Sequence, residues 1–452
     1  MAVWKTYHPT HAAPWNVERV VHLHRRAAFA ATWDEVGRDL NSGVDAAIDR
    51  LLNSYQQTES TAHFEALSQN IAQAATTSNN AVRLKAWWFF RMLKSPDPLG
   101  ERLTLMWHNH FATSNRKVEN LVWMLQQNLG LREHARDRFG QLLSAALKQP
   151  AMLKWLDADA NRNGHPNENL GRELLELFTL GIGNYSEGDV QSAARALTGW
   201  TIKDDEFVFR ESRHDDDILD LFGAQSKLNG DDLVDRVLQH PAIAKRLAWR
   251  ICTTFMGETT CDEEALTELA EGLRQRDLNI GWAVETVLRS ERFFAPNNIR
   301  TRIAGPAEHV VAAIKALELD DPPPSTLQLS EWSTRMGQDL FYPPSVGGWT
   351  EGRAWLDSRA VIARCNYANA VSSGRLWRLG SAAPIESSLE RLLARHNVAS
   401  RLRDRADWFA KLLIGKSSAG TIDDVSDGLG DTDTPLADIV GRLLARPDYF
   451  LA

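Results

Sequence analysis

Two short segments carry side chains whose types and spacing could perform chemistry. Residues 107–111 place two histidines and an asparagine between a tryptophan and a phenylalanine, and residues 167–181 place three glutamates and an arginine among leucines. Setting such polar groups beside a hydrophobic core costs free energy unless they are paired or bound to a ligand. We therefore treat both segments as candidates for catalysis, for metal binding or for buried structural networks.

The second segment is predicted to be one helix that begins after Asn167 and ends before Gly181. At about 100° per residue, its apolar side chains form one arc, and Glu168, Arg172 and Glu176 form a separate stripe. That stripe is either an exposed ladder of ion pairs, worth roughly a few tenths of a kcal/mol per pair, or part of a site.

Glu173 lies at the margin of the apolar arc, where partial burial is expected to raise the pKa of its carboxyl group. Glu173 and Glu176 would point into one cavity as metal ligands or as an acid and a base. Arg172, or Arg195 in the next predicted helix, would clamp an anion there. Gly171 adjoins the apolar arc, so a neighbouring helix is expected to approach closely at that point.

His108 and His110 suggest a metal site, but their spacing opposes it if the helix continues through them. His110 would then share a face with Leu99 and Leu103. His108 would lie about 160° away, on the other side. The two rings would bind one ion only if the helix ended near Trp107. His110 is therefore either a core histidine with both nitrogens satisfied or half of a ligand pair.

Residues 214–217 form an acidic loop, His-Asp-Asp-Asp. Such a loop is either simply solvated or a set of oxygen ligands for a divalent cation, in which His214 and Asp215 would act together with His108 and His110. The identity of that metal is left open by the sequence.

Tryptophan is abundant, with 16 residues in the chain. Many are expected in the core, but exposed indoles also stack on sugar rings. Trp107, Trp200 and Trp349, with the amides of Asn109 and Asn167, are our candidates for binding such a substrate.

Composition limits the class of protein. With 452 residues, of which 43% are hydrophobic and 24% charged, the chain is expected to be globular, with two or three packed units. The net charge of −8 argues against a nucleic-acid partner, and no apolar run reaches the roughly 20 residues of a membrane span. The first 14 residues lack the features of a signal peptide and three cysteines fit a reduced compartment, so we expect a cytoplasmic protein.

Apolar residues recur at helical spacing along most of the chain. Helices are predicted at residues 17–26, 33–52, 61–75, 81–93, 99–110, 118–128, 131–148, 167–181, 186–198, 233–256, 261–274, 281–290, 304–317, 388–394, 401–414 and 436–445. Residues 206–210 and 218–221 are expected to form one small hairpin. The predicted fold is all-α, a multi-helix globular bundle or toroid-like assembly with one small β-hairpin and long loops. Residues 319–326 mark a sub-boundary, and residues 415–435 are expected to form a mobile loop.

Many of these residues form an ordered set of motifs. They are residues 26–29, 101–102, 107–114, 167–181, 185, 189–190, 194–195, 198–200, 214–215, 222–223, 343–344, 346, 348–349, 355, 364 and 446–449. With them the chain resembles the bacterial domain-of-unknown-function 1800 family over essentially its whole length, which implies one family-length unit, residues 1–452.

The resemblance implies a partner more clearly than a mechanism, because no mechanism is assigned to the family. Its members are often encoded beside a phosphatase- or sulfatase-like protein that carries an export signal. Such a protein is therefore an expected partner. Export of the folded chain together with that partner is the alternative to a cytoplasmic location.

Two functions follow as hypotheses. In the first, the protein is a hydrolase of a polysaccharide or glycan-derived substrate, with Glu173 or Glu176 as the base and either a divalent metal or two carboxylates alone. In the second, it is a non-catalytic binding partner or export chaperone of the phosphatase- or sulfatase-like protein, and the polar motifs are sealed networks. Burial discriminates between them, because catalytic groups must line an open cavity.

Overall fold

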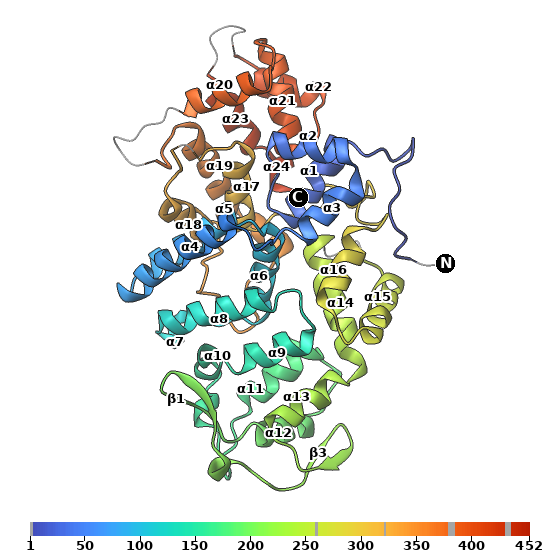
Figure 1. The fold of residues 1–452 in the computed structure, drawn as a ribbon, viewed down its shortest axis with the longest axis vertical. Coiled ribbons are helices and arrows are strands. Elements are labelled where there is room, and N and C mark those ends of the chain that lie inside the picture. Colours follow the sequence, from blue (N-terminus) through green and yellow to red (C-terminus); the bar gives the residue numbers. More distant parts are fainter. Residues whose placement is uncertain (1–2, 258–260, 321, 378–384, 430–434) are drawn as a thin grey trace.

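The computed structural model describes residues 3–257, 261–320, 322–377, 385–429 and 435–452. Helices make up 62% of the structure, and the described strands form two small antiparallel sheets, which confirms the predicted all-α class (Figure 1). Among the described helices, none combines the length and the apolar character that crossing a membrane requires.

The helices of the first half of the chain precede the strands. They are α1 (Val17–Ala27), α2 (Trp33–Ser42), α3 (Val44–Leu52), α4 (Glu59–Thr77), α5 (Ala81–Lys94), α6 (Pro98–His110), α7 (Asn115–Val118), α8 (Leu121–Glu133), α9 (Phe139–Leu147), α10 (Pro150–Trp155), α11 (Glu168–Glu173) and α12 (Glu187–Ala196). A π-helical segment, Leu174–Thr179, follows α11 directly.

The strands and the remaining helices complete the chain. They are β1 (Trp200–Lys203), β2 (Glu206–Phe209), β3 (Leu219–Leu221), β4 (Ala224–Ser226), α13 (Gly230–Leu238), α14 (Pro241–Phe255), α15 (Glu263–Gln275), α16 (Ile280–Leu288), α17 (Pro306–Ala316), α18 (Thr326–Arg335), α19 (Ser358–Ser372), α20 (Ile385–Arg395), α21 (Leu402–Ile414), α22 (Ala419–Ser426), α23 (Leu436–Leu444) and α24 (Pro447–Phe450). Short 3₁₀ turns lie at Ala158–Ala160, Glu211–Arg213 and Gly352–Leu356.

Helix starts follow ordinary capping chemistry. Thr32 and Ser186 each accept a hydrogen bond from the third residue of the helix they precede, whose acidic side chain bonds back to the cap. Proline occupies the first position of α6, α14 and α17, where its missing N–H costs no helical hydrogen bond. Local sequence therefore sets where these helices begin.

The described residues form two large hydrophobic cores and one small cluster around Val20 and Val36, and α6 lies between the two large cores. The first core joins α1 and α3 to α8–α16, while the second joins α4 and α5 to α17–α24. Leu99 and Leu103 of α6 face the first core, whereas Leu105 faces the second. Figure 1 shows this arrangement, with α19–α24 at one end of the molecule, α9–α13 at the other, and α6 in the middle.

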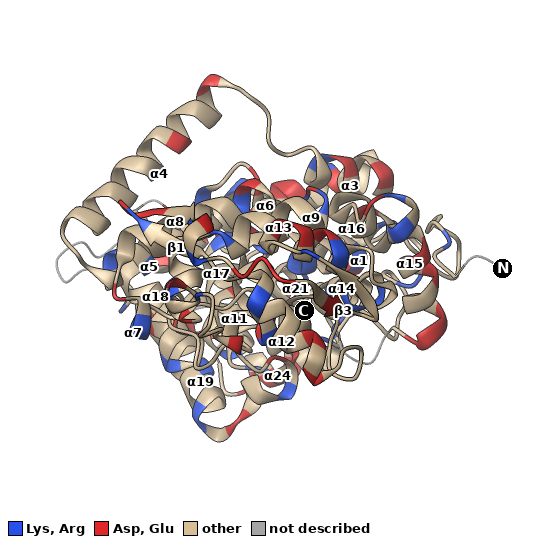
Figure 2. Ribbon diagram, turned by 90° about the horizontal axis from the view of Figure 1, so that it is seen from below, with Lys and Arg blue, Asp and Glu red and all other residues tan. Residues whose placement is uncertain are grey.

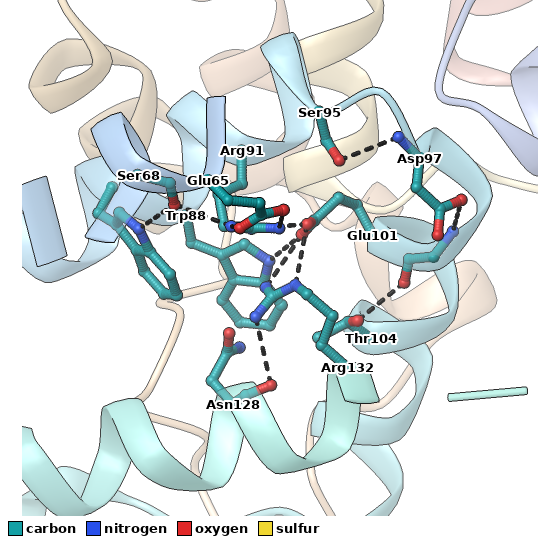
Figure 3. Close-up of polar contacts among 12 residues, drawn as sticks. Glu65, Ser68, Trp88, Arg91, Ser95, Asp97, Glu101, Thr104, Asn128 and Arg132 are labelled. Atoms are coloured by element: carbon teal, nitrogen blue, oxygen red, sulfur yellow. Dashed lines mark hydrogen bonds and ion pairs between the residues drawn. The ribbon is translucent and has the colours of Figure 1, made fainter. Parts of the chain in front are cut away.

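A buried ion network fixes α6 to its neighbours (Figure 3). The Glu101 carboxylate accepts hydrogen bonds from Arg91 of α5 at 2.8 Å and from Arg132 of α8 at 2.9 and 3.0 Å. Trp88 donates to the same carboxylate, and Arg91 also reaches Glu65 on α4. Burial would raise the pKa of Glu101, but the two arginines outweigh it and hold that pKa below its usual range.

The strands pair differently from the prediction. β1 pairs with β2, with Trp200 opposite Phe209, and β3 pairs with β4, with Leu219 opposite Ser226. Each predicted strand thus forms a tight hairpin with its own sequence neighbour, because a short reversal is easier to close than the long loop between them.

Helix α4 projects from the body of the molecule (Figure 2).

The structure shows what lies around the predicted sub-boundary at residues 319–326 and within the predicted mobile loop at residues 415–435. Residues 319–326 connect α17 with α18, whose side chains belong to the same core, although residue 321 lies outside the described residues. Within residues 415–435, Ser418 caps the helix α22, and residues 430–434 lie outside the described residues.

Candidate functional site

Helix α6 continues through both histidines of residues 107–111 and ends at His110, so their rings lie on different faces. The ring of His108 contacts Trp88, Phe341 and Trp349. Its Nε2 accepts a hydrogen bond from the backbone N–H of Phe341 at 3.2 Å. Burial lowers the pKa of His108 to about 3, so this ring is a neutral member of the second core.

His110 faces the first core and a cavity beside it. Its Nε2 lies 3.0 Å from the carbonyl oxygen of Phe178, which can only accept, so Nε2 carries the proton and Nδ1 keeps a lone pair. Nδ1 has no hydrogen-bond partner among the described residues. Burial, followed by the positive charges of Arg250 and Arg246, lowers the pKa of His110 to about 3. The ring is thus a neutral imidazole in one fixed tautomer.

The π-helical segment supplies the carbonyl that orients this ring. The predicted single helix is α-helical over Glu168–Glu173 and widens into a π-turn over Leu174–Thr179. Its last carbonyls have no partner within the helix, and two of them accept bonds from the site. Phe178 accepts from His110, and Leu177 accepts from Arg246 at 3.5 Å. Single π-turns are frequent at functional sites, and this one orients two side chains of a cavity.

A cavity of about 180 Å³ lies beside His110, and we call it the His110 cavity. Its walls come from α6, the π-helical segment, α14 and the loop before Gly352–Leu356. The lining residues are Asn109, His110, Leu177, Arg246, Trp249, Arg250, Thr253, Gly347, Trp349 and Glu351. This volume is below the roughly 300–1,000 Å³ of pockets for drug-sized ligands, so it fits a small group or the end of a longer molecule.

Two arginines make the His110 cavity electropositive. Arg250 forms an ion pair with Glu351 at 3.2 Å and donates to the carbonyl of Met106 at 3.1 Å. Arg246, one helical turn earlier, stacks on Trp249 at 4.6 Å and forms no ion pair with a described carboxylate. Burial and the neighbouring Arg250 lower the pKa of Arg246. With two guanidinium groups and one carboxylate, the cavity has an unbalanced positive charge suited to an anion.

Asn109 holds the loop that closes the cavity. Its Oδ1 accepts a hydrogen bond from the backbone N–H of Trp349 at 2.7 Å, and its Nδ2 donates to the Trp349 carbonyl at 3.3 Å. Gly348 has a φ of 76°, and a Cβ atom there would lie 2.2 Å from the Asn109 amide oxygen, so the contact requires glycine. Trp349 is only 5% exposed. The pair therefore forms a wall rather than a sugar-stacking surface.

The glutamates of α11 and the π-helical segment lie outside the His110 cavity. Arg172 pairs with Glu168 at 2.9 Å and with Glu187, as an exposed ladder would, whereas Glu176 accepts a hydrogen bond from Tyr185 at 2.8 Å. Glu176 lies within the π-turn and pairs with Tyr185 rather than with Arg172. Partial burial and the Glu176 carboxylate raise the pKa of Glu173, as expected.

Arg195, His214 and Asp215 form a second polar cluster near the hairpins. Arg195 binds the Asp215 carboxylate at 2.6 and 3.1 Å and also pairs with Asp217. The Nδ1–H of His214 donates to the carbonyl of Thr198 at 3.1 Å, and the Thr198 hydroxyl accepts the backbone N–H of Asp215 at 2.8 Å. The cluster fixes the loop after α12 and does not line the His110 cavity.

Trp107, Trp200 and Asn167 have structural contacts. Trp107 is fully buried and its Nε1 donates to the carbonyl of Ala135 at 3.0 Å, and Trp200 is 2% exposed. Asn167 caps α11 and also donates to the carbonyl of Asp157. The two indoles have no free face for a sugar ring, so they are core residues rather than substrate contacts.

The predicted metal ligands are not gathered around one point. Among the described residues, one group of three places ligand atoms within 4.8 Å of one another, namely Asp34, Glu318 and His396, and there Glu318 already pairs with Arg395. None of the four predicted ligands belongs to this group, namely His108, His110, His214 and Asp215.

Sequence reasoning missed the residues that give the His110 cavity its charge. Arg246 and Arg250 lie on α14, Glu351 lies 101 positions after Arg250, and none of the three belongs to a recognisable motif. One local signal existed, because two arginines one turn apart flank Trp249 on a largely apolar helix.

Comparison with known proteins gives one match. The family profile described as "Protein of unknown function (DUF1800)" matches residues 22–451. No curated protein and no solved structure matches the chain. Since the profile covers nearly the whole sequence, the chain belongs to the DUF1800 family.

Proposed function

We propose that the protein is a hydrolase that cleaves an ester in a glycan-derived, anionic substrate at the His110 cavity. The observation that carries the proposal is the meeting of a neutral, oriented imidazole with two arginines in one small cavity. The cavity fits the anionic end of a longer substrate, and Trp249, which is 38% exposed, offers the remainder an apolar contact.

His110 acts as the general base in this proposal. Its Nδ1 lone pair takes a proton from a water molecule, and the water oxygen attacks the ester centre. The electron pair that moves onto the ester oxygen is stabilised by Arg246 and Arg250. The protonated imidazole then returns its proton to the departing alcohol. This assignment replaces Glu173 and Glu176 as base, because neither lines the cavity.

Paired-carboxylate glycoside cleavage is less well supported. That chemistry needs two carboxyl groups on either side of the bond, and Glu351 is the one carboxylate among the cavity residues. Glu351 is also held in an ion pair with Arg250 at 3.2 Å. A divalent cation stays a prediction, and metal analysis of the purified protein by mass spectrometry tests it.

The second candidate is a non-catalytic partner or export chaperone of a phosphatase- or sulfatase-like protein. Its support is that several side chains of the sequence motifs are buried, since Trp107, His108 and Trp200 are each at most 2% exposed. In that case the His110 cavity would bind an acidic group of the partner and catalyse nothing.

The test measures hydrolysis of 4-nitrophenyl acetate, phosphate and sulfate by the whole chain, with sulfate binding followed by calorimetry. His110→Gln keeps an amide donor toward the Phe178 carbonyl but removes the base, so we expect turnover to fall at least 100-fold while sulfate still binds. Arg246→Gln should weaken sulfate binding about tenfold, because it removes the unpaired guanidinium.

Lys245→Met is the matched control, since this exposed neighbour on α14 pairs with Glu263 and does not line the cavity. It should change neither readout. Sulfate binding without turnover of any ester would favour the non-catalytic candidate. Failure of sulfate to bind, or equal binding by Arg246→Gln, would overturn both candidates at this cavity.

A further inference from the structure

Three side chains that can bind a metal meet where segments far apart in the sequence come together. Asp34 lies in the first turn of α2, Glu318 follows the end of α17, and His396 directly follows α20. One carboxylate oxygen of Asp34, one of Glu318 and one ring nitrogen of His396 all lie within 4.8 Å of one another. We call this group the His396 cluster, and none of its members lines the His110 cavity.

Two residues of the His396 cluster carry a buried polar atom that lacks a protein partner. The Oε1 of Glu318 and the Nε2 of His396 are shielded from solvent, and neither forms a hydrogen bond with a described residue. The Nδ1 of His396 lies 3.9 Å from the Oδ1 of Asp34, which is too far for a hydrogen bond. Leaving buried polar atoms unpaired costs free energy. A cation bound among these side chains satisfies the Glu318 oxygen and one nitrogen of the ring.

Neighbouring contacts hold two of the three side chains in place. The His396 side chain is 10% exposed, and its ring stacks on Trp408 of α21 with centroids 5.7 Å apart. The second oxygen of Glu318, Oε2, pairs with Arg395. Metal-bound imidazoles and carboxylates are usually oriented by such outer contacts. Asp34 is 69% exposed, so its carboxylate can turn toward an ion.

The charges around the His396 cluster favour a cation. Asp34 and Glu318 bring two carboxylates, and among the described residues Arg395 is the one arginine or lysine that pairs with either of them. Lys94 and Lys315 line a small cavity together with Glu318, but both interact with other carboxylates. Two carboxylates and one guanidinium group leave one negative charge beside the imidazole.

One imidazole and two carboxylates suit a divalent transition metal ion. Imidazole nitrogen is a good ligand for zinc, whereas magnesium and calcium prefer oxygen ligands. Zinc binds nitrogen and carboxylate oxygen at about 2.0–2.2 Å, which places the ligand atoms of a tetrahedral site roughly 3.5 Å apart. The ligand atoms of the cluster must therefore approach one another by roughly 1 Å, which a change of rotamer at the exposed Asp34 can provide.

We propose that Asp34, Glu318 and His396 bind one zinc-type divalent metal ion. The ion joins α2 to the segments that follow α17 and α20, and water completes its coordination on the exposed side of Asp34. This site goes beyond the proposed hydrolase, because it shares no residue with the His110 cavity.

The experiment titrates zinc into the untagged full chain by calorimetry after treatment with a chelator. We expect one ion to bind per chain at about micromolar concentration or below. Magnesium should bind about tenfold more weakly or worse, because an ion that prefers oxygen gains little from the imidazole. Zinc should also raise the thermal midpoint of unfolding, because the three ligands meet only in the folded chain.

Two substitutions remove single ligands. His396→Gln removes the imidazole and Asp34→Asn removes one carboxylate, so each should weaken zinc binding about tenfold or more. Asp34→Asn stays informative if His396→Gln fails to fold, because Asp34 is exposed. Asp45→Asn is the matched control, since Asp45 is also the second residue of a helix and 68% exposed, but it pairs with Arg289 outside the cluster.

Asp45→Asn should bind zinc as the unchanged protein does. His110→Gln should do so too, which keeps this test separate from that of the proposed hydrolase. The proposal is overturned if zinc does not bind in a one-to-one ratio, if magnesium binds equally well, or if Asp34→Asn retains full affinity. Loss of zinc from His110→Gln with unchanged binding by Asp34→Asn would instead place the ion at the His110 cavity.

Discussion

At the scale of single residues, His110 shows how environment decides what an imidazole can do. Its Nε2–H is fixed by the Phe178 carbonyl, and burial with two nearby guanidinium groups keeps the ring neutral. His108, two residues earlier, is equally neutral but is enclosed by aromatic rings. The same residue type therefore serves as a core side chain at one position and as a candidate base at the next.

The lowered pKa of His110 has a consequence for stability. In the unfolded chain the pKa is near 6.5 and in the folded protein about 3, so the unfolded state binds more protons between these values. Stability is complete above pH 6.5 and is lost as the pH falls toward 3, by about 1.4 kcal/mol per pH unit for each such group.

We expect His110→Gln to remove the contribution of His110 to the pH dependence of the free energy of unfolding. Urea unfolding between pH 6.5 and 4 should show a free energy of unfolding that falls less steeply by about 1.4 kcal/mol per pH unit. His63→Gln, at an exposed position on α4, is the control and should leave the slope unchanged. A slope for His110→Gln equal to that of the unchanged protein would contradict a depressed pKa at this ring.

At the scale of helices, the contact between α11 and α12 depends on Gly171. A Cβ atom at this position would lie 3.0 Å from the backbone nitrogen of Ala194 and 3.3 Å from the carbonyl carbon of Ala193. Backbone atoms of a packed helix cannot move aside cheaply, so the two helices would have to separate. The close approach expected at Gly171 from its angular position is confirmed.

Gly171→Ala should therefore lower the free energy of unfolding by about 1–3 kcal/mol, measured by urea denaturation. Gly37→Ala is the matched control, because Gly37 lies in the middle of α2 with no atom within 4 Å of the added Cβ. In that open position alanine should stabilise the protein by up to about 1 kcal/mol. Equal effects of the two substitutions would show that α11 and α12 are not in tight contact.

The helices and turns also show how much of the site could be predicted from the sequence. The 100° step correctly separated His108 from His110, and capping residues placed the start of α12 at Glu187. The π-turn after Glu173 was not foreseen, because its wider hydrogen-bond pattern has no local sequence signature. The His110 cavity was missed for another reason, since Arg246 and Glu351 meet only through tertiary packing.

At the scale of the whole molecule, the Glu101 network joins the four helices α4, α5, α6 and α8 (Figure 3). Arg91 and Arg132 both depend on this carboxylate, which is 1% exposed. Removing its charge leaves two buried cations with Glu65 as their one remaining acidic partner among the described residues. Losing half of a buried ion pair costs more than any exposed pair contributes.

We expect Glu101→Gln to destabilise the protein by about 3–5 kcal/mol, visible as a large fall in the thermal midpoint. Glu331→Gln breaks an exposed pair with Arg335 on α18 and should cost less than about 0.5 kcal/mol. A small effect of Glu101→Gln would indicate that water reaches the network and screens its charges.

The position of α6 between the two cores also restricts how this chain can vary in length. Each face of the helix is committed to a different set of neighbours, and its last turn delivers His108 to one side and His110 to the other. Inserting or deleting one residue within the helix would rotate everything after it by about 100°, so both rings would leave their partners at once. Relatives of this protein should therefore align through residues 98–111 without gaps, even where substitutions are frequent.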